Sequence, residues 1–466
     1  MIAPARLAAF EILRAVGSGR TDLGTALARA RTRLPDERDR ALAGEIATGT
    51  LRWQGAFDHV IEAFAGRPLR KLDPEVVDIL RLSMFQLVHL DRVPASAAVK
   101  DAVDLAGKAG KRSASGLVNA VLRRTSRERT RLPLPPRPAT GPDPTLSLPG
   151  TRSGPDPKFS TEGTKRGQAP SSEALDYLSI TLSHPRWLME RWLDRYGFEA
   201  AEAWAKFNNA PAPLTLRVNT LKTSRATLIE ALQEHGVDVE PAPRAADGLV
   251  VRAGNPLATP LDALGHFFIQ DEASQLVAVF AAAQPGERIL DACASPGGKT
   301  TAMAANMNGR GLIVAADIRG RRVELLARTI TRSGATNVHV VQADATVPLP
   351  FGPVFDRVLL DAPCSGLGTL RRDPDIKWKR TAAELPAMAK AQAGMLRHAA
   401  DVLTPSGTLI YATCSSEPEE NEDVVEAFVA ANPAFRPAGP PFQTLPHRDG
   451  LEAFFAAMLV RTKDLR

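Results

Sequence analysis

Two cysteines lie just past two short apolar runs that we predict to be strands. Cys364 follows Val358–Leu360 in the loop that begins at Asp361, and Cys414 follows Thr408–Ala412. The carboxyl ends of parallel strands meet at one edge of a sheet, so we expect the two thiols to lie at one crevice. A free cysteine is most often a small buried hydrophobic residue. The polar, loop-like sequence around these two favours reactivity for both.

A pair of thiols beside a nucleotide-type pocket suits one kind of group transfer. Carbon 5 of a pyrimidine is a poor nucleophile, but a thiolate that adds to carbon 6 makes carbon 5 enamine-like. Carbon 5 can then attack an electrophilic methyl group, a base removes the carbon-5 proton, and the thiolate leaves. Since a thiol with an ordinary pKa of about 8.5 is mostly protonated at neutral pH, such a site must favour the thiolate.

A glycine-containing turn supplies the candidate pocket. The segment Asp291–Thr300 reads DACASPGGKT and joins a predicted strand to a predicted helix. Small residues let the backbone approach a ligand, and the helix N-terminus presents free N–H groups. By itself the turn could also be a tight turn without a ligand. It resembles the end of a P-loop, but the glycine needed five residues before Gly298 is Cys293, so an NTPase is a minority alternative. We expect Cys293 to pack or to meet the ligand through its backbone.

Three acidic residues follow successive predicted strands. Asp317, Asp344 and Asp361 each stand where an apolar run ends. In an open parallel sheet these positions face one crevice, where an acid after the second strand commonly binds a ribose. An acid after the third could accept from an exocyclic amine. Each could instead cap a helix, although three in succession favour the shared crevice.

The elements that position these residues alternate between strand and helix after about residue 285. Apolar runs predict strands at Arg288–Leu290, Leu312–Ala316, Val338–Gln342, Val358–Leu360 and Thr408–Ala412. Periodic segments predict helices at Thr300–Met307, Arg322–Ser333 and Leu385–Val402. This alternation is typical of an α/β, Rossmann-like, doubly wound parallel sheet.

Upstream of that sheet the chain divides into three parts. Helical spacing through residues 1–125 predicts an all-α bundle, with Val76–Leu90 as its buried central helix. We assign residues 126–171 to a Pro/Gly-rich linker, because residues 132–171 contain ten prolines and five glycines. Residues 172–265 form a small α+β segment, with a helix at Arg225–Glu234 and strands on either side of it. The doubly wound sheet occupies residues 266–466.

Charge and composition narrow the functional classes. Residues 1–131 hold 23 Lys and Arg against 15 Asp and Glu, a net charge of +8, and the rest of the chain has a net charge of −2. A basic first domain suggests a nucleic-acid partner. Three cysteines in 466 residues argue against a disulfide scaffold, and the scattered histidines against a metal site. No segment predicts a membrane span or a signal peptide, so we expect a soluble, cytoplasmic protein.

Several motifs together resemble one enzyme family. The sequences DACASPGGKT (291–300), LLDAPCSGLGTLRRDPDIKW (359–378) and YATCSSEPEEN (411–421) are similar to the RNA 5-methylcytosine methyltransferases of the Sun/NOL1/NOP2 family. So are SHPRWLMERW, LRVNTLK and QDEASQLV further upstream. The segments ARLAAFEILRAV and SGLVNAVLRR resemble the NusB-like RNA-binding domain of the bacterial RsmB (Sun, Fmu) subgroup. The resemblance covers nearly the whole chain except the linker.

The resemblance implies a cofactor and its site. The methyl donor would be S-adenosyl-L-methionine, with the glycine turn on its methionine and ribose. Asp317 would hold the ribose, Asp344 the adenine edge, and Asp361 the region between donor and target base. The residues implied at the cofactor are Cys293, Ala294, Ser295, Pro296, Gly297, Gly298, Lys299, Asp317, Asp344 and Asp361.

The resemblance also implies catalytic roles and a substrate. Cys414 would be the nucleophile that attacks carbon 6, and Cys364 would assist release of the product, with Asp361 beside them. The substrate would be a cytosine in 16S ribosomal RNA of the small subunit, bound by a monomer without a metal. The RNA or active-site contacts implied besides Lys299 are Arg217, Asn219 and Lys377. A non-catalytic RNA-binding factor remains an alternative, although the cysteine pair argues against it.

Overall fold

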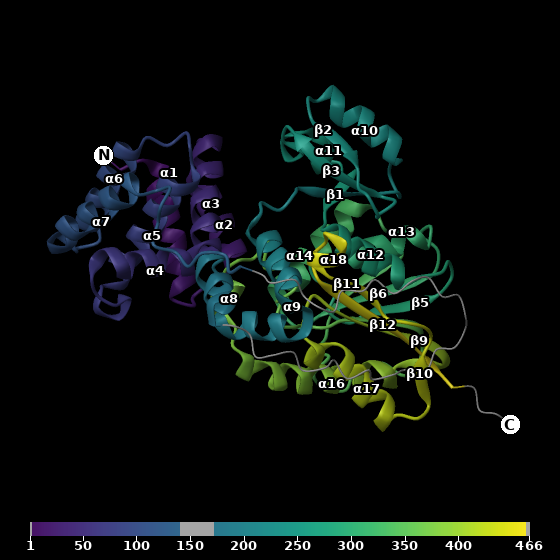
Figure 1. Cartoon of the computed structure of the whole chain (residues 1–466). Coiled ribbons are helices and arrows are strands. Elements are labelled where there is room, and N and C mark those ends of the chain that lie inside the picture. The colour runs from purple at the N-terminus through teal and green to yellow at the C-terminus, as the bar shows by residue number, and fades with distance from the viewer. Residues whose placement is uncertain (1, 140–171, 463–466) are drawn as a thin grey trace. The chain divides into compact units, whose positions relative to one another are not determined.

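The computed structural model describes residues 2–139 and 172–462, and the chain forms two compact units (Figure 1). The first unit comprises residues 1–210 together with residues 373–379, and the second comprises residues 211–372 and 380–466. Most of the predicted linker, residues 140–171, lies outside the described part of the chain.

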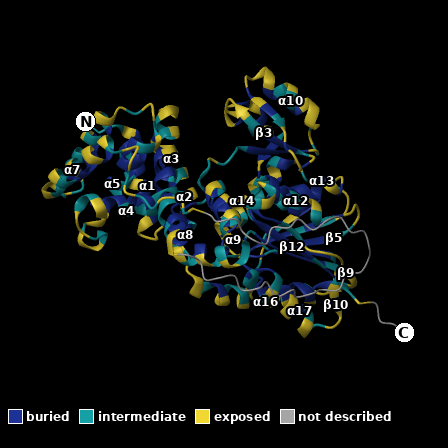
Figure 2. Cartoon of the chain, in the orientation of Figure 1, coloured by how far each residue is buried: buried dark blue, intermediate teal, exposed yellow. Residues whose placement is uncertain are grey.

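Seven helices open the first unit, as the apolar periodicity predicts. They are α1 (Pro4–Gly17), α2 (Leu23–Arg33), α3 (Glu37–Arg52), α4 (Gln54–Ala65), α5 (Pro74–His89), α6 (Ala95–Lys108) and α7 (Ser115–Arg127). The side chains of Asp22 and Asp36 cap the N-termini of α2 and α3 by accepting from backbone N–H groups. Helix α5 is buried on most of its surface, which confirms its predicted central place in the bundle (Figure 2).

The first unit extends further along the chain than the sequence predicts. It also contains α8 (Ser172–Asp176), a short π-helix (Tyr177–Thr181), α9 (Arg186–Asn209) and α15 (Ile376–Lys379). The two indole rings of α9, Trp192 and Trp204, are fully buried and stack 4.1 Å apart. The Ser183 hydroxyl accepts from the backbone N–H of Gly55 at 2.9 Å. Residues 172–210 therefore pack with the N-terminal helices, although the sequence assigns them to the α+β segment.

A small antiparallel sheet begins the second unit. Its strands are β1 (Thr215–Val218), β2 (Asp238–Pro241), β3 (Gly248–Ala253) and β4 (Phe267–Ile269), in the order β2-β3-β1-β4. Two helices, α10 (Arg225–Glu234) and α11 (Pro260–Ala263), accompany it. Leu216, Leu249 and Phe267 are buried in its core. The predicted small α+β segment is confirmed.

The larger sheet of the second unit has eight strands. They are β5 (Arg288–Asp291), β6 (Leu312–Asp317), β7 (Val338–Gln342), β8 (Phe355–Asp361), β9 (Leu403–Thr413), β10 (Phe435–Pro437), β11 (Phe442–Thr444) and β12 (Phe454–Arg461). The order is β10-β12-β9-β8-β5-β6-β7, with β11 beside β12. The helices of this part are α12 (Glu272–Phe280), α13 (Gly298–Asn306), α14 (Gly320–Ser333), α16 (Leu385–Asp401), α17 (Glu422–Ala431) and α18 (Pro446–Asp449).

The direction of the strands corrects one prediction and confirms another. Strands β5 to β9 pair in parallel, as expected of a Rossmann-like sheet. The sheet is not wholly parallel, because β12 runs antiparallel to both β9 and β10. Strand order reverses between β5 and β8, and a ligand crevice is expected beyond the carboxyl ends of strands at such a point.

None of the described helices is long and apolar enough to cross a membrane.

Candidate functional site

A glycine turn joins β5 to α13, and its Gly298 is partly exposed. Gly297 adopts a left-handed conformation with φ of 105°, which a residue with a side chain rarely adopts. A Cβ atom on Gly298 would come within 3.3 Å of the Gln270 side chain. The hydroxyl of Thr300, in the first turn of α13, donates to the buried carboxylate of Asp291 at 2.7 Å. Burial nevertheless raises the pKa of Asp291 to about 7, with the charge of Asp361 acting in the same direction.

A cavity of about 260 Å³ opens beside this turn. Its lining contains the predicted residues Cys293, Ala294, Ser295, Pro296, Gly298, Lys299 and Asp361. It also contains Asp291 and five residues to which the sequence assigned no role, namely Ile269, Gln270, Asp271, Ser274 and Phe454. Four of these five fall in or next to the QDEASQLV motif, which was the available signal. No sequence signal marks Phe454 as a site residue, because an aromatic residue at the start of a strand usually belongs to the hydrophobic core.

Two of the predicted acids lie at the same sheet edge but outside the lining of this cavity. Asp317 ends β6 with its side chain buried, and its carboxylate accepts from the backbone N–H of Arg319 at 3.3 Å. Asp344 follows β7, and its Oδ1 accepts from the backbone N–H and hydroxyl of Thr346 at 2.8 and 2.6 Å. Asp344 thus stabilises a local turn, and no helix begins there for it to cap.

Lys299 and Asp361 form an ion pair at the wall of the cavity. The Lys299 Nζ atom lies 2.6 Å from Asp361 Oδ2 and 5.5 Å from the centre of the Phe454 ring. Burial acts to lower the pKa of Lys299, but the charge and hydrogen bond of Asp361 outweigh it and raise that pKa. Lys299 is therefore held as a cation beside the carboxyl ends of β5 and β8.

The structure brings the two candidate cysteines together. Strands β8 and β9 pair so that Asp361 lies opposite Ala412, which places the loops after them side by side. The Sγ atoms of Cys364 and Cys414 are 3.3 Å apart, and both side chains are half-buried. The hydrogen bond to Cys414 and burial together hold the pKa of Cys364 well above its usual range.

Cys293 behaves differently from this pair. Burial, followed by the charges of Asp291 and Asp361, raises the pKa of its thiol well above the ordinary value. Its side chain packs against the core that contains Leu290 and Leu360. A neutral, packed thiol agrees with the expectation that Cys293 serves through packing or backbone contacts.

The three side chains implied as RNA contacts are buried, which corrects that expectation. Arg217 is 3% exposed, donates to Gln270 Oε1 at 2.7 Å and to Thr301 Oγ1 at 2.6 Å. Asn219 is fully buried and donates to the carbonyls of Gly265 and Ser333. Both residues thus tie the small sheet to the helices of the larger one.

Lys377 belongs to the first unit, where it is 1% exposed. Its Nζ lies 3.2 Å from the carbonyl oxygens of Arg52 and Ser183, and 2.9 Å from Asn209 Oδ1. Burial and the charge of Arg52 hold the pKa of Lys377 well below its ordinary value. The side chain therefore joins three segments of the first unit and is not available to RNA.

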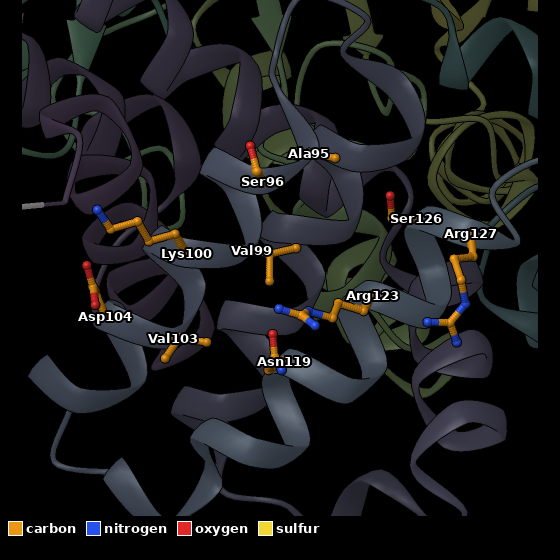
Figure 3. Close-up of a pocket in the computed structure, with 10 residues that line it drawn as sticks. All are labelled: Ala95, Ser96, Val99, Lys100, Val103, Asp104, Asn119, Arg123, Ser126 and Arg127. Carbon is orange, nitrogen blue, oxygen red and sulfur yellow. The ribbon is translucent and has the colours of Figure 1, made fainter.

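A second concavity, of about 500 Å³, lies between α6 and α7 of the first unit. Lys100 and Asp104 reach it from α6 and Arg123 and Arg127 from α7, with Val99 between them (Figure 3). Lys100, Arg123 and Arg127 are exposed. We call these ten lining residues the α6–α7 groove: Ala95, Ser96, Val99, Lys100, Val103, Asp104, Asn119, Arg123, Ser126 and Arg127. Three cations against one carboxylate make it a basic groove.

Within residues 2–139 and 172–462, no three His, Cys, Asp or Glu side chains gather as a metal ion would require.

Three family models match the chain. Residues 278–460 match the 16S rRNA methyltransferase RsmB/F family, residues 3–127 match the NusB family, and residues 184–258 match the ferredoxin-like domain of RsmF/B-like methyltransferases.

Curated relatives and a solved structure extend the match over the full length. Ribosomal RNA small subunit methyltransferase B of Pseudomonas putida is 34% identical over 434 residues, which cover 92% of this chain and 90% of that protein. Its Vibrio cholerae namesake is 33% identical over 458 residues, 94% of each chain. The crystal structure named PH0851 superposes with a TM-score of 0.76 at 25% identity and covers 99% of both chains.

Proposed function

Because the chain belongs to the RsmB/F family of 16S rRNA methyltransferases, we propose that it methylates carbon 5 of a cytosine in that RNA through a covalent bond to Cys414. Membership in this family argues against the NTPase and the non-catalytic RNA-binding factor, and S-adenosylmethionine is the methyl donor. The single observation that supports methylation of carbon 5 through Cys414 is the 3.3 Å separation of the Cys364 and Cys414 sulfur atoms. Both cysteines lie beyond the carboxyl ends of β8 and β9.

The residues around the cavity fit the donor. When bound, S-adenosylmethionine supplies a methyl group on a positively charged sulfonium, which a carbon nucleophile can take. The carboxylates of Asp271, Asp291 and Asp361 line the cavity and suit a cationic ligand. Gly298 lines the cavity, and its lack of a side chain lets a ligand approach the backbone closely. We assign the ribose to Asp317 and the adenine edge to Asp344, at the ends of β6 and β7.

Within this proposal the two cysteines have complementary tasks. Cys414 adds as a thiolate to carbon 6 of the cytosine, which makes carbon 5 nucleophilic. After methyl transfer and loss of the carbon-5 proton, the bond between carbon 6 and Cys414 breaks. Cys364, whose raised pKa keeps it a thiol, donates a hydrogen bond toward the departing sulfur and stabilises it as a thiolate. The ion pair of Lys299 and Asp361 orients the target base beside the donor.

The α6–α7 groove supports a role of the first unit in holding RNA. Exposed cations attract the phosphate backbone, and such contacts position an RNA without specifying its sequence. Lys100, Arg123 and Arg127 would replace Arg217, Asn219 and Lys377 as the RNA contacts. The target cytosine must be single-stranded or leave its stack to reach Cys414.

The identity of the methylated nucleoside tests the proposed function. The purified protein is incubated with a 16S rRNA transcript and methyl-labelled S-adenosylmethionine, and the digested nucleosides are separated and identified by mass spectrometry. We expect label in 5-methylcytidine alone. Label in a nitrogen-methylated nucleoside, or in any other base, would contradict the carbon-5 chemistry. Bisulfite mapping of 16S rRNA from cells that lack the protein would then identify the position.

A further inference from the structure

A buried carboxylate lies directly behind the two cysteines. Glu420 ends the short 3₁₀ turn Pro418–Glu420 and is fully buried. Its backbone carbonyl accepts from the hydroxyl of Tyr411, a buried residue of β9, at 2.6 Å. A buried charged side chain is costly unless its oxygen atoms are fully hydrogen-bonded. The partners of this carboxylate therefore indicate why it is there.

Both cysteine-bearing loops donate to the Glu420 carboxylate. Ser365, which follows Cys364, donates its backbone N–H to Oε1 at 2.8 Å and its hydroxyl to Oε2 at 2.5 Å. Ser415, which follows Cys414, donates its hydroxyl to the same Oε2 at 2.5 Å. The two hydroxyl oxygens lie 3.2 Å apart. One carboxylate oxygen thus bridges the residues next to the two sulfur atoms.

A third element fixes the carboxylate itself. The amide of Gln392, on α16, donates to Glu420 Oε1 and to the carbonyl of Pro363, each at 3.0 Å. Four donors to two oxygens match an ionised carboxylate, which only accepts hydrogen bonds. Helix α16 and both loops are therefore joined at the Glu420 carboxylate, while β9 is joined to the backbone carbonyl of the same residue.

We propose that Glu420 is a positioning residue that holds the two cysteine loops together and so sets the distance between the sulfur atoms of Cys364 and Cys414. The expected effect of Glu420 on methylation rests on the proposed function. Its effect on the distance between the two sulfur atoms does not. The charge of Glu420 also contributes to the raised pKa of Cys364, after the larger effects of Cys414 and burial. Glu420 thereby helps to keep Cys364 a hydrogen-bond donor.

The first test measures the sulfur separation directly, in the full chain. Glu420→Gln keeps the shape of the side chain but replaces one accepting oxygen with a donating NH₂ group. Diamide oxidises two adjacent thiols to a disulfide, so the rate of the Cys364–Cys414 crosslink, followed by peptide mass spectrometry, reports their proximity. We expect Glu420→Gln to slow the crosslink at least about tenfold. Glu426→Gln removes an exposed carboxylate of α17 and should leave the rate unchanged. Equal rates in wild type and Glu420→Gln would overturn the inference.

The second test uses methylation and separates the inference from the proposed function. A displacement of about 1 Å near reacting atoms can cost about 100-fold in rate, so we expect kcat of Glu420→Gln to fall about 100-fold. The KM for S-adenosylmethionine should change less than twofold, because Glu420 does not line the cavity. An inactive wild-type protein would count against the proposed function, while the crosslink would still judge Glu420. Wild-type kcat in Glu420→Gln would overturn the inference and leave the function standing.

Removal of the two serine hydroxyls provides variants that keep the Glu420 carboxylate itself. If Glu420→Gln does not fold, Ser365→Ala and Ser415→Ala each remove one connection and should each slow the diamide crosslink. The double variant should be no slower than the slower single one, because both act through the same carboxylate. If the two single effects on the crosslink rate multiplied in the double variant, or if neither substitution slowed the crosslink, a shared connection through Glu420 would be contradicted.

Discussion

The sulfur atoms of Cys364 and Cys414 lie 3.3 Å apart, although 50 residues of chain separate the two cysteines. Two parallel strands achieve this, since β8 and β9 end side by side and each cysteine follows within three residues of its strand. At this distance one thiol can donate to the other. This arrangement suits the roles proposed for Cys414 as nucleophile and for Cys364 in product release.

Binding of S-adenosylmethionine should strengthen as the pH rises. Burial raises the pKa of Asp291 to about 7, so this carboxyl is neutral well below pH 7 and negative above it. The negative form attracts the positively charged donor. With this pKa the ionised fraction of Asp291 rises about tenfold between pH 6 and pH 8, mostly below pH 7, and we expect calorimetry at pH 6, 7 and 8 to show the affinity rising in the same way.

Asp291→Asn is the control for that titration. The amide cannot ionise, so the variant should lose the rise in affinity between pH 6 and pH 8 that depends on this carboxyl. Titration of the donor's own groups is the same for both proteins and cancels in the comparison. An identical pH dependence in wild type and variant would show that Asp291 does not face the donor.

Charge removal from the α6–α7 groove should weaken RNA binding in a salt-dependent way. The triple variant Lys100→Gln/Arg123→Gln/Arg127→Gln eliminates three exposed cations. For single-stranded RNA the slope of log Kd against log salt falls by about 0.7 for each phosphate that is no longer neutralised, so a decrease of about 2 is expected. Filter binding of a 16S rRNA fragment over a salt series measures it.

The matched control removes the same charge elsewhere in the first unit. Arg38→Gln/Arg67→Gln/Arg70→Gln also substitutes three basic side chains, none of which lines the groove. Equal losses in both triple variants would mean that general basicity, and not the groove, binds RNA. Deletion of residues 1–125 is a poorer test, because residues 172–210 and 373–379 pack within the same unit.

Lys377 should matter for stability and not for RNA affinity. Lys377→Met keeps much of the side-chain volume but leaves three oxygen acceptors, on Arg52, Ser183 and Asn209, without this donor. A buried unsatisfied polar group costs about 1–3 kcal/mol. We expect the free energy of unfolding of the first unit, measured by urea denaturation, to fall by at least that amount. Lys108→Met, at an exposed position of α6, should be near neutral. If Lys377→Met reduced the slope of log Kd for RNA against log salt and left the free energy of unfolding unchanged, Lys377 would be an RNA contact after all.

The sequence predicts the elements of the second unit closely, for a physical reason. The predicted strand Val338–Gln342 and helix Arg225–Glu234 match β7 and α10 residue for residue. Short strands and capped helices are determined by local sequence patterns and by the turns around them. Direction is not local, which is why β12 could not be recognised as antiparallel.

The failures concern residues whose surroundings come from distant parts of the chain. Lys377 reads as a basic residue in a basic motif, and only its contacts with residues 52, 183 and 209 reveal its burial. Glu420 stands among the acidic residues of EPEEN, where Glu417 is buried as well, and nothing in that run distinguishes the carboxylate that joins the two loops. The cysteine pair was predictable because both members follow strands, whose ends the topology brings together.

The covalent intermediate tests the central claim most directly. Cys364→Ala should retain the nucleophile but lose the thiol that stabilises its departure, so enzyme and RNA should accumulate as an adduct. The variant is mixed with 16S rRNA and S-adenosylmethionine, resolved on a denaturing gel, and the adduct is digested and mapped by mass spectrometry. Our account predicts a methylated cytidine attached to Cys414, and no adduct or methylation in Cys414→Ala. Attachment at Cys293, or full methylation by Cys414→Ala, would contradict it.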